Sequence, residues 1–383
     1  DGFYGNSVII PSMDWYAENI LSVTGTYYGV EKTIEKEFDV FKSEQTLQHC
    51  FKISCYTIKS VSSISDGTNL DGVRGVETFT IGDSTYVVAA AQWADKIVIY
   101  DISDPASPVY VSELEDGTDT GRCTESNGER CLDGPVELDI ATIGGKPYAV
   151  VAAYNDDGIE IIDISDPTNP TSVGRATHEG DYKELNAPYD VAITTIGDST
   201  YAVVTAYDDD GVQIIDISDP TSPSATAHVS HCTGGGCDTP DYTELNHPID
   251  VEIATIGGST YAVVAAGVDD GVQIIDISTP SSPSATSTVE DDSTKELEGA
   301  NGVAITTIGS STYAVITGTI DDGISIIDIS TPSSPVYVSE LEDGTDTGVC
   351  TASNGERCLD GPVELDIATI GGKPYAVVAA HYD

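Results

Sequence analysis

Acidic residues recur at two fixed positions ahead of the six Thr-Ile-Gly tripeptides of this chain. Five residues before each threonine, the sequence has Gly75, Glu137, Asp190, Asp250, Gly302 and Glu364. Three residues before each threonine, it has Glu77, Asp139, Ala192, Glu252, Ala304 and Asp366. The spacing therefore assigns eight carboxylates to equivalent places in a repeated unit.

Carboxylate oxygens are the ligands that hard cations such as Ca²⁺ prefer. Carboxylates that lie close together without a cation repel one another and raise one another's pKa. If the units close into a ring, these positions predict a calcium site at its centre, with no other cofactor. The expected ligands are Glu137, Asp139, Asp190, Asp250, Glu252, Glu364 and Asp366. The alternative is that these side chains extend into solvated space between the units.

A second cluster of possible metal ligands comprises His228, His231, Cys232 and Cys237. Two histidines and two cysteines this close together could bind zinc. The sequence lacks the second half of any standard zinc motif, so a disulfide between the two cysteines, beside two exposed histidines, is the favoured interpretation.

Short acidic turns end in the glycines Gly158, Gly211, Gly271 and Gly323. Asp-Gly is a strong hairpin-turn dipeptide, so a turn role is favoured over calcium ligation. The two Asp-Gly-Thr-Asp-Thr-Gly loops, residues 116–121 and 343–348, have a calcium-like composition but lack the EF-hand pattern.

None of the motifs that mark hydrolases, zinc proteases, P-loop enzymes or dinucleotide-binding enzymes occurs in a suitable context. The six histidines occupy positions that are not equivalent between units. The sequence therefore predicts a protein that is not an enzyme. A calcium-dependent hydrolase is the less favoured alternative.

A thirteen-residue motif is the clearest repeated element. Its copies begin with glycine, alternate apolar and polar residues, and end in Asp-Ile-Ser-x-Pro-x-x-Pro; they span residues 158–170, 211–223, 271–283 and 323–335, with a divergent copy at 96–108. Alternation with β-branched residues predicts a strand, and the two prolines predict an extended crossing after it.

The Thr-Ile-Gly tripeptides recur at intervals of 62, 53, 60, 52 and 62 residues. One unit predicts four strands: 190–195, 200–206, the motif strand from Gly211, and 225–230. Four short antiparallel strands at such a period are typical of a β-propeller blade. The predicted fold is all-β, a β-propeller of six four-stranded blades.

The chain divides into a non-repeat segment, residues 1–66, and a propeller of five complete repeats and a partial sixth, residues 67–383. The sixth repeat has its first two strands only. Because open sheet edges invite pairing, we expect the N-terminal segment of the same or a neighbouring subunit to complete that blade. Strand-like pieces there are 6–11, 20–30, 37–42 and 46–59, although Val30–Phe41 could instead form a short helix.

The motif resembles the LVIVD repeat, a family of β-propellers found in surface and secreted proteins of archaea and bacteria. The resemblance covers residues 71 to 383 and rests on five copies of Gly-x-x-Ile-Ile-Asp-Ile-Ser-x-Pro-x-x-Pro. It implies a propeller fold and an extracellular or cell-surface location. The family implies no particular activity.

Composition limits the classes of partner. The chain has 64 acidic and 15 basic residues, a net charge of −49, which would repel nucleic acid. No apolar run is long enough to span a membrane, and Asp1 resembles a processed start.

The eight cysteines indicate the compartment, because they form four close pairs. Such pairs predict disulfides and an oxidising compartment rather than free thiols. The expected disulfides join Cys50 to Cys55, Cys123 to Cys131, Cys232 to Cys237, and Cys350 to Cys358.

These observations predict an extracellular structural protein of the cell surface. Its copies would form a filament or surface layer through head-to-tail β-strand addition by the N-terminal segment, so its partner is itself. The alternative is a monomeric adhesion or ligand-binding propeller in which the N-terminal segment closes its own ring.

Overall fold

The structure is a computed structural model of the chain. It describes residues 20–27, 30–37, 62–64, 69–117, 132–231, 242–292, 294–342 and 359–381. Within these residues the protein is almost entirely β-structure, with two short 3₁₀ turns, Gln92–Ala94 and Tyr154–Asp156. No helix in this part of the chain could span a membrane.

Five antiparallel sheets contain four strands each, in chain order. The first is β3 Val73–Ile81, β4 Ser84–Ala91, β5 Lys96–Asp101 and β6 Val109–Glu115; the second is β7 Pro135–Ile143, β8 Lys146–Ala153, β9 Gly158–Asp163 and β10 Thr171–Thr177; the third is β11 Pro188–Ile196, β12 Ser199–Ala206, β13 Gly211–Asp216 and β14 Ser224–Ser230. The fourth is β15 Pro248–Ile256, β16 Ser259–Ala266, β17 Gly271–Asp276 and β18 Ser284–Glu290; the fifth is β19 Ala300–Ile308, β20 Ser311–Gly318, β21 Gly323–Asp328 and β22 Val336–Glu342.

The sixth sheet has two strands in the described residues, β23 Pro362–Ile370 and β24 Lys373–Ala380. Residues 107–153 and 334–380 differ only at two positions, Arg122 against Val349 and Glu125 against Ala352, so these two strands have the same sequences as β7 and β8. The predicted four-strand unit is thus confirmed in five sheets, and the sixth consists of its first half.

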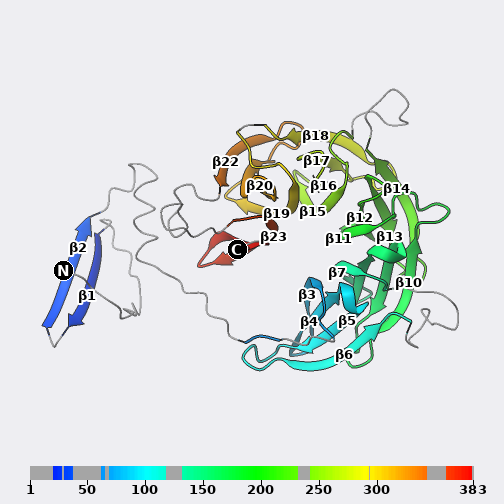
Figure 1. The fold of residues 1–383 in the computed structure, drawn as a ribbon, viewed down its shortest axis with the longest axis horizontal. Helices are drawn as coiled ribbons and strands as arrows, with labels where there is room; N and C mark the ends of the chain where they lie inside the picture. Colours follow the sequence, from blue (N-terminus) through cyan, green and yellow to red (C-terminus); the bar gives the residue numbers. More distant parts are fainter. Residues whose placement is uncertain are drawn as a thin grey trace.

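The sheets are arranged as blades around a centre, with first strands inside and fourth strands outside (Figure 1). Successive first strands are in contact, from β3 through β7, β11, β15 and β19 to β23. Apolar side chains fill the space between neighbouring sheets. For example, Val203, Val212 and Ile214 of the third sheet pack with Val264 and Ile275 of the fourth. The core is therefore divided among the blade junctions, as propeller blades require.

The motif residues Asp-Ile-Ser shape the crossing between the third and fourth strands. In the third sheet, Asp216 accepts a hydrogen bond from the Ser218 amide at 2.9 Å. The Ser218 hydroxyl then accepts one from the Thr200 amide at 3.0 Å, at the start of β12. The isoleucine between them, Ile217, is fully buried. Each motif residue thus has a local structural role.

The N-terminal segment contributes one hairpin to the described residues. β1, Ile20–Tyr27, pairs with β2, Val30–Glu37, and the two form a separate sheet. Val30–Glu37 is therefore a strand, and the alternative short helix is wrong over these residues, because each of them is paired with a residue of β1 in an antiparallel register. The other predicted strands, 6–11, 37–42 (apart from Glu37) and 46–59, lie outside the described residues. Completion of the sixth sheet by this segment stays a prediction.

Candidate functional site

The first strands bring acidic side chains from five sheets toward a common centre. Electrostatic interactions link carboxyl groups that belong to different sheets: Glu77 interacts with Asp139 and Asp366. Glu137 interacts with Asp190 and Glu364. The two positions predicted to converge therefore do converge. The fifth sheet supplies Gly302 and Ala304 there, so its side of the centre has no carboxylate at these positions.

Glycine at position 302 permits close packing of the fifth and sixth sheets. A Cβ atom at Gly302 would lie 2.8 Å from the carbonyl oxygen of Val363. A Cβ at Gly75 would similarly collide with the Glu137 side chain. The two glycines in this column therefore make room for a neighbouring strand and its carboxylate.

Three carboxylates at the centre join consecutive sheets through backbone amides. The Val251 amide donates to Asp190 Oδ2 at 2.9 Å, and the Val303 amide donates to Asp250 Oδ2 at 2.6 Å. The Ile193 amide donates to Asp139 Oδ2 at 2.7 Å. In each case the acceptor and donor belong to adjacent first strands. These carboxylates therefore stabilise the arrangement of blades as well as setting the charge of the centre.

Asp250 also shares hydrogen bonds with two other carboxyl groups. The side chain of Asp250 forms hydrogen bonds with the side chains of Asp190 and Glu364. Two carboxylates can form such a bond only if one holds a proton. Burial, with repulsion from Glu364 and Asp190, raises the pKa of Asp250 well above its usual value. Burial and mutual repulsion therefore favour a proton shared among these three carboxyl groups.

The neighbouring carboxyl groups are also shifted toward the protonated form. Burial is the largest cause in each case, and nearby carboxylates add to it. It raises the pKa of Asp139 to about 6 and the pKa values of Glu252 and Glu364 to about 7. It raises the pKa of Glu137 well above its usual value. Near neutral pH, the centre can hold protons that a bound cation would displace.

The described residues contain no group of three or more His, Cys, Asp or Glu side chains arranged to hold a metal ion. Asp139, Asp190 and Asp250 there accept hydrogen bonds from backbone amides. Calcium binding by the seven expected ligands stays a prediction, and it would require these side chains to move toward a shared cation.

Sequence reasoning missed an arginine and an aromatic row beside this acidic centre. Arg74 donates a hydrogen bond to the Tyr189 hydroxyl, and its guanidinium lies 5.0 Å from the centroid of that ring. Its charge lowers the pKa of both Glu137 and Glu364. Tyr189 also packs between Tyr154 and Tyr207, at centroid distances of 6.3 and 5.7 Å. Arg74 and Tyr189 occupy the same position in the repeat, two residues ahead of Val76 and Val191. This shared position is the sequence feature that could have identified them as neighbours of the acidic centre.

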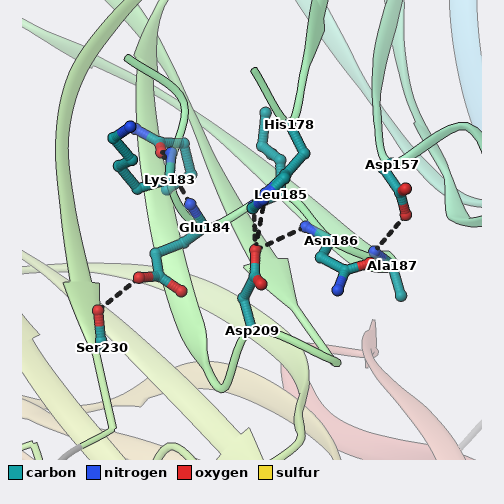
Figure 2. Close-up of polar contacts among 10 residues, drawn as sticks. Asp157, His178, Lys183, Glu184, Leu185, Asn186, Ala187, Asp209 and Ser230 are labelled. Carbon is teal, nitrogen blue, oxygen red and sulfur yellow. Dashed lines mark hydrogen bonds and ion pairs between the residues drawn. The ribbon is translucent and has the colours of Figure 1, made fainter. Parts of the chain in front are cut away.

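The acidic turns have the predicted turn role and a second role between blades (Figure 2). Asp157 and Asp210 have left-handed backbones, with φ of 50° and 55°. Asp157 Oδ1 accepts a hydrogen bond from the Ala187 amide of the next sheet at 3.1 Å. Asp209 Oδ2 accepts from the Asn186 amide of its own sheet at 2.8 Å. Acidic turns of two successive sheets thus hold the same loop, which leads into β11.

Histidines lie at two of these junctions. His178 Nδ1, at the end of the second sheet, lies 2.9 Å from Asp209 Oδ2 of the third, as Figure 2 shows. His231 Nδ1 lies 3.0 Å from Asp269 Oδ2 of the fourth sheet. His231 therefore contacts a turn carboxylate. His228 is exposed.

The structure does not test the predicted cysteine chemistry. All eight cysteines lie outside the described residues: Cys50, Cys55, Cys123, Cys131, Cys232, Cys237, Cys350 and Cys358. The disulfides of Cys50 with Cys55, of Cys123 with Cys131, of Cys232 with Cys237, and of Cys350 with Cys358 therefore stay predictions. Zinc binding beside His231, the less favoured alternative, is untested for the same reason.

The loops of calcium-like composition are only partly described. Asp116 and Gly117 belong to the described residues, whereas 118–121 and 343–348 do not. Asp116 Oδ1 accepts a hydrogen bond from the Leu132 amide at 3.4 Å. This contact gives Asp116 a structural role at the loop base.

Comparisons with known proteins agree with the repeat pattern. A family model described as the LVIVD repeat matches residues 82–116, 139–177, 199–230, 256–291 and 312–343. A search of curated proteins finds no match. Among solved structures, the chain is similar to the periplasmic gluconolactonase PpgL of Pseudomonas aeruginosa, with 12% identity, a TM-score of 0.50, and coverage of 74% of this chain and 75% of that one.

Two further structures are similar at low identity. Sqt1 from Chaetomium thermophilum has 10% identity and a TM-score of 0.50, with 78% of this chain and 62% of that chain covered. A functionally unknown protein from Desulfotomaculum acetoxidans has 14% identity and a TM-score of 0.48, with 70% of each chain covered. At these identities the likeness concerns the fold alone.

Proposed function

This chain is an LVIVD-repeat protein, and we propose that it is an extracellular structural protein whose copies join by β-strand addition at the edge of β24. The proposal covers a filament or surface layer at the cell surface. One observation carries it: β8 and β24 have the same sequence, but among the described residues β8 lies between two strands and β24 pairs with β23 alone. Val150 of β8 is fully buried, whereas the matching Val377 of β24 is 53% exposed.

Apolar side chains are also exposed on the first sheet. Val150 packs with residues of the following sheet, such as Val191 and Val204. Val76 of β3 occupies the position of Val191, yet it is 58% exposed while Val191 is 3% exposed. Among the described residues, Val76 of β3 and Val377 of β24 thus lack the cover that Val191 and Val150 have at the equivalent positions. Such a surface favours association.

The edge of β24 is suited to pairing with another strand. A strand at a sheet edge presents unpaired backbone amides and carbonyls, and proteins use such edges to bind extended segments. A contact between two different surfaces of one chain does not close on itself, so it builds a filament or a lattice. The net charge of −49 would keep such assemblies from associating nonspecifically through other faces.

The proposal includes an extracellular location and no catalytic activity. The four close cysteine pairs favour an oxidising, extracytoplasmic compartment. We propose no catalysis, because likeness to a gluconolactonase at 12% identity concerns the fold and assigns no residue. The acidic centre would then serve to join the blades, with calcium as its expected cation.

The acidic centre also favours a second candidate, a monomeric propeller that binds a ligand at this end. The carboxylates lie beside Arg74 and the ring of Tyr189, so charged and aromatic groups are available together. A cationic or polyhydroxylated ligand would fit this mixture. Binding by a monomer that does not assemble would favour this candidate.

The main experiment is the variant Val377→Lys, which places a charge on the exposed face of β24. We expect loss of large assemblies in sedimentation velocity and electron microscopy, with unchanged circular dichroism. The matched control is Ile370→Lys, since Ile370 is 54% exposed but lies at the turn end of β23. A wild-type chain that sediments only as a monomer of about 40 kDa, the mass of the chain, would contradict the proposal.

A further inference from the structure

Lys96, the first residue of β5, carries an ammonium group that three side chains of the first sheet surround. Its Nζ donates to Asn69 Oδ1, in the loop before β3, at 3.3 Å. The same atom lies 3.5 Å from Glu113 Oε1 and 3.6 Å from Glu115 Oε2, both on β6. Lys96 is 5% exposed. The first sheet thus holds an ammonium group of its own at the start of its third strand.

The fourth sheet has a glycine at this place. Gly271, the first residue of β17, lies opposite Glu290 of β18, as Lys96 lies opposite Glu115. Directly opposed residues of an antiparallel pair have their side chains on the same face of the sheet. Glu290 is therefore placed as Glu115 is, beside a residue that has no side chain to neutralise it.

A second carboxylate, that of Glu244, lies against the same glycine. Glu244 stands in the loop before β15, at the position that Asn69 has before β3. A Cβ atom at Gly271 would lie 2.6 Å from Glu244 Oε2. Burial, with repulsion from Asp269 and Glu290, raises the pKa of Glu244 to about 7. The fourth sheet thus has two carboxylates where the first sheet has acceptors of an ammonium.

Gln273, on the same face of β17 as Gly271, adds an acceptor without a donor. Gln273 is 0% exposed. Its Nε2 donates to the carbonyl oxygens of Ile274 and Ser287, at 3.3 and 3.0 Å. Its Oε1 has no hydrogen-bond partner within the part of the chain that the structure describes. A buried acceptor in this state costs free energy unless a donor reaches it.

The third sheet shows where this acceptor points. The equivalent Gln213 donates through Nε2 in the same way, to the residue after it and to β14. Its Oε1 then accepts from the amides of Lys183 and Glu184, in the loop before β11, at 3.0 and 3.3 Å. Since the two amides are oriented alike, Gln273 Oε1 faces the loop that carries Glu244.

We propose that Glu244, Gln273 and Glu290 form a binding site for a primary alkylammonium group. An ammonium has three N–H donors and no acceptor, so it matches a site of two carboxylates and one amide oxygen. A ligand would supply there what Lys96 supplies in the first sheet. Glu290 is exposed, whereas Glu244 is 6% exposed, so the site is open to solvent on the side of Glu290. The inference goes beyond the proposed function and does not depend on assembly.

The nearby lysine of the chain is bonded elsewhere. Lys295 Nζ donates to the backbone carbonyl oxygen of Glu290 at 3.0 Å and to the carboxylate of Asp292. A metal ion would need ligands gathered around one point, and the described residues hold no such group of three or more acidic, histidine or cysteine side chains. An ammonium instead directs its rotatable donors to separate acceptors, as Lys96 does.

The first test attaches the ammonium to the chain through the variant Gly271→Lys. The matched control is Gly211→Lys in the third sheet, where a Cβ would also lie 2.6 Å from a glutamate oxygen, that of Glu184. There, however, the Ser230 hydroxyl already donates to Glu184. We expect Gly271→Lys to unfold at a higher urea concentration than Gly211→Lys, and Glu290→Gln to remove that difference. Equal losses of stability in the two lysine variants would overturn the proposal.

The second test adds a free ligand to the unmodified chain at pH 8. Propylammonium chloride should raise the thermal unfolding midpoint with the logarithm of its concentration. Tetramethylammonium chloride, which has the charge but no N–H donor, should not do so at the same concentration. Glu290→Gln should reduce the rise, and Asp208→Asn, in an exposed turn, should retain it. Equal rises with both salts, or a rise that Glu290→Gln leaves unchanged, would overturn the site.

A blocked lysine, Nα-acetyl-lysine methylamide, distinguishes two sources of the ammonium group. A rise in the midpoint with this compound, reduced by Glu290→Gln, supports binding of a lysine side chain from another protein. A rise with propylammonium alone supports binding of a small free amine and overturns the lysine source. No rise with either compound, together with equal urea midpoints for the two lysine variants, overturns the proposal as a whole.

Discussion

The carboxylate of Asp157 accepts a hydrogen bond from the backbone amide of Ala187, 30 residues further on and in the next blade. The same contact recurs at every described junction between consecutive sheets, with distances from 2.7 to 3.1 Å: Asp95 to Gly134, Asp157 to Ala187, Asp210 to His247, Asp270 to Gly299 and Asp322 to Gly361. Each of these aspartates ends the turn before a third strand and has a left-handed backbone. The acidic turn is therefore both a hairpin turn and the link between blades.

Replacing one of these linking aspartates should destabilise the propeller. Asp210→Ala removes the acceptor of the His247 amide and places alanine at a φ of 55°. A lost hydrogen bond to a charged group costs roughly 1.5–3 kcal/mol, and the left-handed alanine adds about 1 kcal/mol. Urea denaturation should show this loss, and Asp210→Asn should lose less because asparagine tolerates that backbone.

Asp208 provides the control for that experiment. It lies in the same turn but is exposed. Asp208→Ala should therefore change the free energy of unfolding by at most about 0.5 kcal/mol. Equal effects of Asp208→Ala and Asp210→Ala would show that the contact with the next blade does not matter.

The acidic centre should make the protein less stable as pH rises toward neutrality. The folded pKa values of Asp139, about 6, and of Glu252 and Glu364, about 7, exceed their ordinary values of 3.8 and 4.5. The folded state therefore binds more protons than the unfolded state between those values. The stabilisation is complete below about pH 4 and is lost as pH rises through 6 to 7.

Thermal unfolding between pH 4.5 and 8, without divalent cations, tests whether stability falls as pH rises. The midpoint should fall across this range, and the slope should be smaller in Glu252→Gln, which removes one titrating group while keeping its shape. A midpoint that rises steadily toward pH 8 would contradict the direction of these shifts.

Calcium should restore the stability that the protein loses as pH rises, if the seven predicted ligands bind it. Protons and cations compete for the same carboxylates, so millimolar calcium should raise the unfolding midpoint at pH 7.5 and have little effect at pH 5. A chelator should restore the lower midpoint. The double variant Glu252→Gln with Glu364→Gln should abolish the response, whereas Asp208→Asn in the exposed turn should retain it. A response that is the same at both pH values would contradict binding at this centre.

A buried lysine makes the first sheet differ from the others. Lys96 stands where four motif strands have glycine, and it is 5% exposed. Its Nζ donates to Asn69 Oδ1 at 3.3 Å and lies 3.5 Å from Glu113 and 3.6 Å from Glu115. Lys96→Met should destabilise the protein by roughly 2–4 kcal/mol, because it leaves Glu113 without this partner in a partly buried site.

Lys146→Met is the matched control, since Lys146 is more than half exposed in its ion pair with Asp163. Exposed pairs contribute about 0–1 kcal/mol, so this variant should unfold at nearly the wild-type urea concentration. A smaller loss in Lys96→Met than in Lys146→Met would show that burial of the first pair has no consequence.

Much of a single blade could be predicted from the sequence alone. Residues 190–195, 200–206 and 225–230 were expected as strands, and they lie within β11, β12 and β14. Period-two alternation, turn glycines and proline spacing are local properties, so they determine strands and hairpins without knowledge of the rest of the chain. Equal spacing from Thr-Ile-Gly also assigned the eight carboxylates to equivalent positions of the repeat, but left open whether they face a common centre or the solvated space between units.

Only the tertiary structure decided the contacts between blades. Asp157 reaches Ala187, and Arg74 reaches Tyr189, across 30 and 115 residues that no local pattern connects. Val150 and Val377 show the limit most clearly, because each lies within the same eight-residue strand sequence, yet one is buried and the other is 53% exposed. Burial depends on which strands and sheets lie alongside, and that neighbourhood is a property of the folded chain rather than of the segment.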